Sequence, residues 1–355
     1  DQTRDEVRLL RELERIVTAH GLVEFRQQLA QLLARLEKNW WTVAFVGRVS
    51  CGKSSLLNFL LATDVLPAGV TPVTAVPIRI VRAKSAVATV SFATGKPERI
   101  AAAQLGEFAS EEKNPGNARH VTDILLELPA PRLAGDVCFV DTPGLGSLAS
   151  AGAAQTLAFL PRCDVGVVMI DAAATPGEED VAVGRSLLES GADVLVVVSK
   201  ADVLVPPDRE KMRAYVARQF ATALGRELPV AFVSVAAGHT SLTENWWNEA
   251  LAPRQAHHPE LAAITLRRKI GALREAVVVA LSRRTGCGMG VSPMSANPSG
   301  DTPVPRSSPP LDLGTARAAI EEARRRAYDL PFQTTPAATE VLDAAAATLA
   351  SLDAT

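Results

Sequence analysis

Short apolar runs alternate with amphipathic stretches between Trp41 and Ala236. The runs are TVAFV (42–46), PIRIV (77–81), AVATVSF (86–92), DILLEL (123–128), VCFV (137–140), VGVVMI (165–170), VLVVVS (194–199) and VAFVSV (230–235). Strands this apolar belong to a sheet that helices cover on both faces. The expected covering helices are 53–62, 151–160, 178–190 and 208–224. The pattern predicts an α/β domain built on a mostly parallel sheet.

Helical spacing dominates on both sides of this domain. Residues 1–40 form two predicted amphipathic helices broken at Gly21, and a further helix is expected over 259–284. Apolar positions three and four residues apart give each helix a narrow stripe that packs against other helices. The sequence therefore predicts N- and C-terminal helices that form a bundle.

The segment that follows these helices is poor in apolar residues. Residues 285–310 are rich in Pro, Gly and Ser, which is typical of a flexible linker or insertion. The predicted domains are helices over 1–40, the α/β domain over 41–250, a helix over 251–284, the linker or insertion over 285–310 and further helices over 311–355.

The first apolar run leads through the pattern GxxxxGK[ST] into a helix. The segment reads Gly47, Arg48, Val49, Ser50, Cys51, Gly52, Lys53, Ser54 and Ser55. Such a loop turns successive amides toward phosphate oxygens, and the helix N-terminus adds positive potential. Lys53 would bridge the β- and γ-phosphates, and the Ser54 hydroxyl would bind magnesium. The strand-loop-helix context therefore predicts a nucleotide phosphate site.

Two residues of this loop have alternative interpretations. Arg48 is either an arginine finger supplied by the same chain or a solvated side chain. Cys51 lies near a helix N-terminus and Lys53, which favour a low thiol pKa, or it is simply a small residue that fits the loop. Bound nucleotide is expected to protect Cys51 from alkylation.

A second motif, Asp141-Thr142-Pro143-Gly144, follows the apolar run 137–140. An acidic side chain at a strand end can hold magnesium through water. Gly144 can bring its amide against the γ-phosphate. Because this motif follows a phosphate loop along the chain, it predicts a site that contacts the γ-phosphate and its metal.

A third motif, Ser199-Lys200-Ala201-Asp202, is similar to the guanine-reading pattern [NT]KxD. Asp202 would accept hydrogen bonds from the guanine ring N–H and exocyclic amine, whereas adenine offers an acceptor there and leaves the carboxylate poorly paired. GTP is therefore favoured over ATP. Ser199 shortens the side chain that ties this loop to the phosphate loop. Ser234, after the next run, is the candidate whose loop amide contacts the guanine carbonyl.

The segment 66–77, LPAGVTPVTAVP, adds a rarer pattern between the first two motifs. Together with GRVSCGKSS, PAPRLAGDVCFVDTPGLGS and VVVSKADVL, it resembles the dynamin superfamily, especially bacterial dynamin-like GTPases, over residues 41 to 236. The resemblance implies a P-loop GTPase domain on a neck of helices, hydrolysis of GTP to GDP and phosphate with magnesium, and a homodimer through the GTPase domain.

The resemblance also implies roles for particular residues. Thr74 would be the switch threonine, whose carbonyl orients the attacking water and whose hydroxyl approaches magnesium. Ser50 matches a serine that helps to hold a monovalent cation, K or Na. Val49 stands where eukaryotic dynamins carry a water-positioning glutamine, so either slow turnover or a water held by the backbone alone is expected. The catalytic candidates are Lys53, Ser50, Thr74 and Gly144. The metal-binding candidates are Ser54, Thr74 and Asp141.

Composition and charge exclude some classes of binding partner. The 355 residues include 37 Lys and Arg against 39 Asp and Glu, and only 5% are aromatic, so no nucleic-acid partner is expected. The four cysteines form no CxxC pair, and the histidines lie at no zinc-ligand spacing. The sequence has no apolar run of about 18 residues and no apolar signal segment, so a cytoplasmic protein is expected. A membrane surface or another protein stays open as its partner.

Two other functions stay open at this point. The first is a GTP-gated interaction switch with little hydrolysis, which is suggested by Val49 and by a chain too short for a long stalk. The second is a GTPase of ribosome or tRNA assembly, which shares the phosphate, DxxG and base-reading motifs. The segment 66–77 and the balanced charge disfavour the second alternative.

Overall fold

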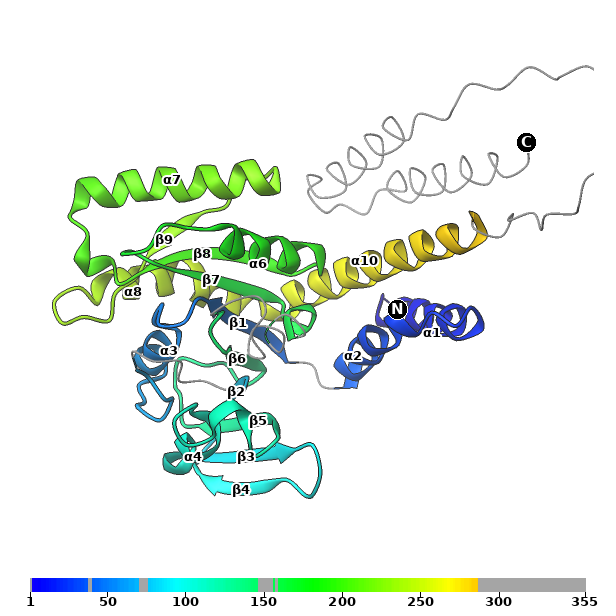
Figure 1. Cartoon of the computed structure of the whole chain (residues 1–355), viewed down its shortest axis with the longest axis horizontal. Helices are drawn as coiled ribbons and strands as arrows, with labels where there is room; N and C mark the ends of the chain where they lie inside the picture. The colour runs from blue at the N-terminus through cyan, green and yellow to red at the C-terminus, as the bar shows by residue number, and fades with distance from the viewer. Residues whose placement is uncertain (1, 38–39, 70–75, 146–155, 157–158, 287–355) are drawn as a thin grey trace, which may run out of the picture. The chain divides into compact units, whose positions relative to one another are not determined.

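A mixed sheet of nine strands forms the centre of the protein (Figure 1). The computed structural model describes residues 2–37, 40–69, 76–145, 156 and 159–286. The strands are β1 (Trp41–Gly47), β2 (Ile78–Arg82), β3 (Val87–Phe92), β4 (Glu98–Ala101), β5 (Val121–Leu128), β6 (Val137–Asp141), β7 (Val165–Asp171), β8 (Asp193–Ser199) and β9 (Val230–Phe232). All eight predicted runs form strands.

The strand order is β4-β3-β5-β2-β6-β1-β7-β8-β9. The strands from β6 to β9 are parallel, whereas β2 is antiparallel to β6, and β3 is antiparallel to both β4 and β5. The prediction of a mostly parallel sheet is therefore confirmed. The sequence pattern missed β4, because this short edge strand is exposed and lacks the apolar signature of a buried strand.

The helices are α1 (Gln2–Ala19), α2 (Arg26–Glu37), α3 (Lys53–Leu61), α4 (Gly106–Ala109), α6 (Glu178–Glu189), α7 (Pro206–Leu224), α8 (Ser241–Trp246), α9 (Ala252–Ala256) and α10 (His258–Gly286). A π-helix, Trp247–Leu251, joins α8 to α9. Three of the four predicted covering helices are confirmed. The fourth, 151–160, falls largely outside the described residues, as does the chain from residue 287 onward, which includes most of the predicted linker and the last helices.

Alternation along β1 divides the core into two layers. Trp41, Val43 and Phe45 pack with α3 and the π-helix, whereas Ala44 and Val46 pack with α6 and α7. Successive side chains of a strand point to opposite faces, so a strand apolar at every position is buried on both. The layers leave the carboxyl ends of β1, β6, β7 and β8 at one edge of the sheet.

The flanking helices form the predicted bundle. Gly21, at φ +60°, lies in the turn between α1 and α2. Their apolar stripes pack on α10 in a cluster whose buried members are Leu10, Leu13, Val17, Leu22, Leu29, Leu32, Leu266, Ile270, Leu273 and Val277. Since all ten side chains are buried, the narrow stripes that no single helix can bury alone are covered in the bundle.

Candidate nucleotide site

The phosphate loop connects the end of β1 to the start of α3. Gly47, at φ +156°, approaches β7 so closely that a Cβ atom would lie 2.3 Å from the carbonyl oxygen of Met169. Gly52, at φ +89°, immediately precedes α3, and Ser50 also has a positive φ of 62°. These left-handed conformations fold residues 47–52 tightly around the helix N-terminus.

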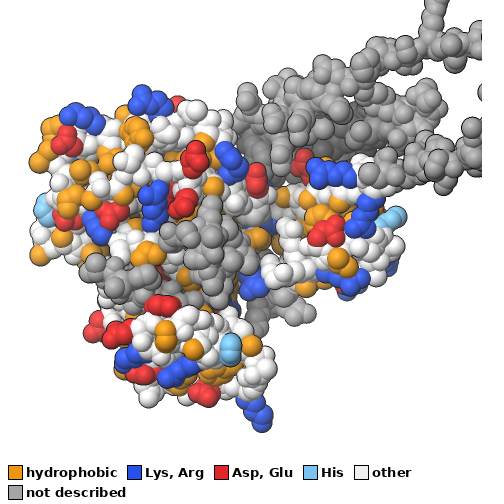
Figure 2. Space-filling model, in the orientation of Figure 1, with side chains coloured by type: hydrophobic (Ala, Val, Ile, Leu, Met, Phe, Trp, Pro, Cys, Tyr) orange, Lys and Arg blue, Asp and Glu red, His pale blue; other side chains and the backbone are white. Residues whose placement is uncertain are grey.

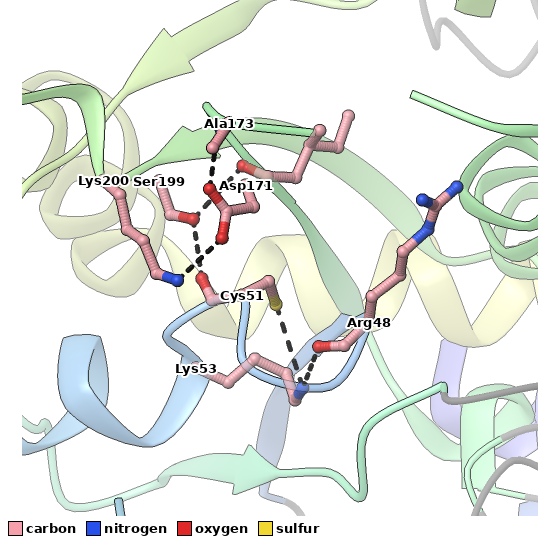
Figure 3. Close-up of polar contacts among 8 residues, drawn as sticks. Arg48, Cys51, Lys53, Asp171, Ala173, Ser199 and Lys200 are labelled. Atoms are coloured by element: carbon pink, nitrogen blue, oxygen red, sulfur yellow. Dashed lines mark hydrogen bonds and ion pairs between the residues drawn. The ribbon is translucent and has the colours of Figure 1, made fainter. Parts of the chain in front are cut away.

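Lys53 is buried at the start of α3, with an exposed fraction of 7%. Its Nζ atom donates to the carbonyl oxygen of Gly47 at 3.1 Å. It also donates to the carbonyl oxygen of Arg48 at 3.0 Å and lies 3.8 Å from Cys51 Sγ (Figure 3). The ammonium is therefore held over the loop by the loop's own carbonyls. This position suits a cation that meets phosphate charge within the loop.

The DTPG motif reaches the same loop from β6. Asp141 is opposite Phe45 in the parallel register of β1 and β6. The Ser54 hydroxyl donates to Oδ2 of Asp141 at 2.6 Å, although the two residues are 87 positions apart. Asp141 is fully buried. The fold thus brings together two of the three predicted magnesium ligands, while the third, Thr74, lies outside the described residues.

This pair of oxygen ligands fits magnesium, which prefers hydroxyl, carboxylate, phosphate and water oxygens. Among the described residues, no group of three or more His, Cys, Asp or Glu side chains could hold a metal ion. Ser54 and Asp141 would therefore need the nucleotide and water for the remaining ligands, as in other phosphate-loop sites.

Gly144 lies directly on the phosphate loop. A Cβ atom at this position would be 2.6 Å from Val49 Cγ2 and 2.9 Å from Val49 N. The Thr142 hydroxyl donates to the carbonyl of Phe45 at 2.7 Å, and the Leu145 amide donates to the carbonyl of Gly47 at 3.1 Å. Only glycine allows this close approach, because any side chain at residue 144 would collide with Val49.

Ser199 ties the base-reading loop to the phosphate loop. Its hydroxyl lies 2.6 Å from the carbonyl oxygen of Cys51 and 3.2 Å from that of Ile170 (Figure 3). Although serine shortens the side chain at this position, β7 and β8 bring residue 199 close enough for its hydroxyl to reach the phosphate loop. Ser199 is thus a site residue that its position in the motif alone did not reveal.

Lys200 follows in a left-handed conformation, at φ +52°. Its ammonium lies 2.7 Å from Oδ2 of Asp171 at the end of β7, and Oδ1 of the same carboxylate accepts from the Ala173 amide at 2.9 Å (Figure 3). Sequence reasoning missed Asp171. An acidic residue at the end of an apolar parallel strand was the available signal, since neighbouring strands end at the same edge.

Asp202 and Ser234 also come together. The Ser234 hydroxyl donates to Oδ1 of Asp202 at 2.6 Å, and this bond is the main cause that lowers the pKa of the Asp202 carboxyl. The Ser234 amide already donates to Thr243 Oγ1 at 3.0 Å. In this conformation Ser234 therefore orients the carboxylate through its hydroxyl, and its own amide is engaged elsewhere.

The two ambiguous loop residues are resolved by their surroundings. Arg48 forms an ion pair of 3.0 Å with Asp180 and is neither fully solvated nor directed at Lys53 (Figure 3). Cys51 is 1% exposed. Burial raises the pKa of its thiol and outweighs the lowering effect of Lys53, so of the two alternatives a low thiol pKa is excluded. Cys51 is the small packed residue of the two alternatives.

These features define a class of protein. A strand that leads through GxxxxGKS into a helix, with the DTPG and SKAD motifs at the same sheet edge, makes the α/β domain a P-loop GTPase fold. The sequence model described as "Dynamin family" matches residues 43–214. This match covers just under half of the chain, and it confirms that the α/β domain resembles dynamin-like GTPases.

Known relatives agree with this assignment. Dynamin-like protein 2 of Campylobacter jejuni is 30% identical over 201 residues, which are 55% of this chain and 31% of that protein. An uncharacterized protein of a Caldicellulosiruptor species, named for its place in the xynA 3′ region, is 26% identical over 217 residues, 61% of this chain and 53% of that protein. The chain therefore spans about half or less of these relatives.

One solved structure shares the fold over most of the chain. It belongs to an oligomerised bacterial dynamin pair described in connection with long-range sensing and tethering of membranes. The TM-score is 0.52 at 17% identity, with 80% of this chain and 44% of that chain covered. In the described part of this chain, no helix is both long and apolar enough to cross a membrane.

Proposed function

We propose that the chain binds GTP with magnesium and hydrolyses it to GDP and phosphate. The observation that carries the proposal is the 2.6 Å contact between Ser54 and Asp141. It joins the phosphate loop to the motif that meets the γ-phosphate, as a hydrolytic site requires. The match of residues 43–214 to the dynamin family supports the same activity.

The roles of the side chains follow from charge and position. Lys53 would lie against the β- and γ-phosphates and offset their negative charge, while the Gly144 amide would donate to the γ-phosphate. Magnesium, when bound, would neutralise charge on the same phosphates, and Ser54 and Asp141 would hold it. Phosphoryl transfer to water depends on positioning and electrostatics, so no protein nucleophile is needed.

The remaining roles rest on the resemblance. Thr74 is proposed to orient the attacking water through its carbonyl. Ser50 is proposed to help hold a monovalent cation, K or Na, near the β- and γ-phosphates. Ser50 lies in the phosphate loop with a φ of 62°, and its place in the loop supports this role.

Guanine recognition would use the second half of the site. Asp202 is proposed to accept from the ring N–H and exocyclic amine of guanine. Its lowered pKa keeps the carboxylate ionised, and the Ser234 hydroxyl orients it. Lys200 would lie along the base, held by Asp171. Adenine would leave the carboxylate facing a lone pair, so ATP is expected to bind poorly.

The test is single-turnover hydrolysis of GTP and of ATP with magnesium and potassium, for wild type and Asp202→Ala. Wild type is expected to release phosphate from GTP at least about 100 times faster than from ATP, since a site built for one hydrogen-bonding pattern rejects the other. Asp202→Ala should lose most of that preference. Asp208→Ala is a matched control, because Asp208 is an exposed carboxylate that pairs with Lys211. Equal use of GTP and ATP by wild type would contradict the assignment.

A GTP-gated switch is the second candidate function. The observation that favours it is Val49, whose side chain packs against Gly144 and has no group that can position water. Tight GTP binding without phosphate release in the same assay would support the switch and rule out efficient hydrolysis.

We also propose that two copies meet across the nucleotide face. Val203 and Val205 are each 59% exposed and Val235 is 40% exposed, and all three lie within three residues of Asp202 or Ser234 in sequence. Exposed apolar residues around a site favour association there. Turnover per molecule of wild type is expected to rise with protein concentration. In the double variant Val203→Asp/Val205→Asp, turnover per molecule should no longer depend on concentration.

Other partners are weighed by charge. On the face shown in Figure 2, acidic and basic side chains are interspersed over the described residues. This mixture does not favour nucleic acid, which attracts a basic surface, and copurification with RNA would revive the ribosome or tRNA alternative. A cytoplasmic protein with a membrane surface or a protein as partner stays part of the proposal, which sedimentation with anionic vesicles would test.

A further inference from the structure

The Arg48 side chain leaves the phosphate loop on the side away from Ser199 and Lys200 (Figure 3). Its guanidinium pairs with Asp180 in the first turn of α6. Its Nη2 atom lies 3.0 Å from Oδ2 of Asp180, whose side chain is only 2% exposed. The same Oδ2 accepts a hydrogen bond of 2.9 Å from the Gly177 amide. A side chain thus joins the phosphate loop to a helix that none of the nucleotide motifs includes.

Gly177 makes room for this ion pair. A Cβ atom at residue 177 would lie 2.2 Å from Arg48 Nη2, so the guanidinium occupies the space that a side chain would fill. The backbone there is extended, at φ −114° and ψ 177°, a conformation that alanine adopts without strain. Alanine at 177 would therefore displace the mobile end of Arg48 while leaving both charges in place.

The backbone around Arg48 supports the DTPG motif. Arg48 and Leu145 form a parallel β-bridge. On the next residue, Val49, the Cα atom lies 2.7 Å from the position that a Gly144 Cβ would take. Arg48 is therefore anchored to Asp180 through its side chain and lies beside the γ-phosphate motif through its backbone.

Stability alone does not account for this pair. Burial raises the pKa of the Asp180 carboxyl, and the Gly177 amide and Arg48 offset only part of that cost. Within the described residues, Asp180 Oδ1 and Arg48 Nε are buried without hydrogen-bond partners, whereas a full guanidinium–carboxylate pair makes two bonds. An ion pair with one partly exposed and one buried partner contributes little net stability, so the main consequence of this one is where it holds the loop.

We propose that Arg48 and Asp180 are positioning residues for the γ-phosphate end of the site. Paired, they hold the loop so that Val49 backs Gly144, whose amide would meet the γ-phosphate. This inference rests on the proposed GTP hydrolysis. The part of the site that binds GDP is held by Lys53 and the base-reading loop, so breaking the pair is expected to affect GTP far more than GDP.

The test compares wild type with Arg48→Ala, Asp180→Asn, their double variant and Gly177→Ala. Single-turnover hydrolysis of GTP gives the rate, and titrations with fluorescent GDP and a non-hydrolysable GTP analogue give both affinities. Each variant is expected to hydrolyse GTP at least about tenfold more slowly, because small misplacements are costly in such sites. GTP-analogue affinity should fall while GDP affinity stays within about twofold, and the double variant should resemble the slower single variant.

Two further variants sharpen the result. Arg48→Lys keeps the positive charge and is expected to retain most of the rate. Arg132→Ala is the matched control: Arg132 and Arg48 are both 36% exposed, and Arg132 pairs with Glu244 outside the phosphate loop. The control should leave the hydrolysis rate and both affinities unchanged.

The proposal is overturned if Arg48→Ala and Asp180→Asn leave the rate and the affinity ratio unchanged, or if their losses add in the double variant. Equal losses of GDP and GTP-analogue affinity together with a lowered Tm would show a structural role only and would also overturn it. If wild type binds GTP without hydrolysing it, the proposed hydrolysis is wrong, and the ratio of the two affinities still decides the role of the pair.

Discussion

Two lysines are buried among the described residues, and they lie at opposite ends of the central strands. Lys53 follows the carboxyl end of β1 and is 7% exposed. Its ammonium donates to the carbonyls of Gly47 and Arg48, which are six and five residues away in the same loop. Both partners are local, and the cation lies where the proposed phosphates would compete for it.

Lys269, on α10, is 1% exposed. Its ammonium donates to the carbonyl of Pro161 at 2.5 Å and of Ser190 at 3.4 Å, which are 108 and 79 residues away. Beside it, the buried Asp164 accepts from the Thr42 amide at 2.8 Å and from the Thr265 hydroxyl. Lys269 thus joins α10 to segments at the amino end of β7 and the carboxyl end of α6.

Two lysines with similar burial therefore have different roles. Around Lys53 the partners are the carbonyls of a loop built to receive a ligand. Around Lys269 the partners come from distant segments, so the contact holds the helical bundle against the domain. Loss of Lys53 should therefore affect binding, and loss of Lys269 should affect folding.

The largest effect is expected for Lys53→Ala. GTP turnover should fall by about 100-fold or more, because a cation aimed at developing phosphate charge is lost, while Tm stays close to that of wild type. Steady-state phosphate release and thermal unfolding measure the two. A variant with normal turnover would show that Lys53 is not part of the site.

The converse is expected for Lys269→Ala. Its removal leaves two carbonyls without this donor and opens a cavity, so the free energy of unfolding should fall by about 2–4 kcal/mol. Chemical denaturation measures this change. GTP affinity should stay within about twofold of wild type, because Lys269 lies at the opposite end of the central strands from the nucleotide site and distant sites act independently. An equal loss of affinity and stability would contradict the division of roles between the two lysines.

Ser199→Ala tests the tie between the two loops. Without the hydroxyl, the bond to the Cys51 carbonyl is lost, and GTP affinity should weaken by about fivefold, which corresponds to about 1 kcal/mol for one hydrogen bond. Ser199→Thr keeps a hydroxyl and is the control, with an affinity near that of wild type. Titration with fluorescent GTP analogue distinguishes them, and identical affinities for all three proteins would show that the tie is unimportant.

The smallest effect is expected for alkylation of Cys51. Since burial raises the pKa of this thiol, it should stay protonated and slow to react through about pH 8.5, where an exposed cysteine ionises. Mass spectrometry of iodoacetamide-treated protein should show slow labelling with or without GTP, in contrast to the earlier expectation of protection by nucleotide. Rapid native labelling that GTP prevents would contradict this burial. The same protein in denaturant provides the reference rate.

Much of the fold was predictable from local sequence. The apolar runs predicted eight of nine strands, and Gly47 through Ser54 predicted the phosphate loop. Both depend on residues close in sequence, because side-chain alternation and backbone turns are set by near neighbours. The strand β4 was not predicted, because an exposed strand lacks the apolar pattern.

Partners far apart in sequence were harder to predict. Asp171, Asp180 and the hydroxyl tie of Ser199 were not predicted, and the sequence left a low thiol pKa of Cys51 open beside simple packing. Each depends on what another strand or helix places beside it. Burial of Cys51, for example, follows from the packing of the layer around β1 and α3.

The sequence by itself determined the phosphate loop, the order of the nucleotide motifs and the helices that need a bundle. Only the tertiary structure decided which side chains meet: Ser54 with Asp141, Ser199 with the Cys51 carbonyl, and Arg48 with Asp180. The physical reason is that local conformation depends on neighbouring residues, whereas these contacts depend on the order and register of strands that bring distant segments to one edge of the sheet.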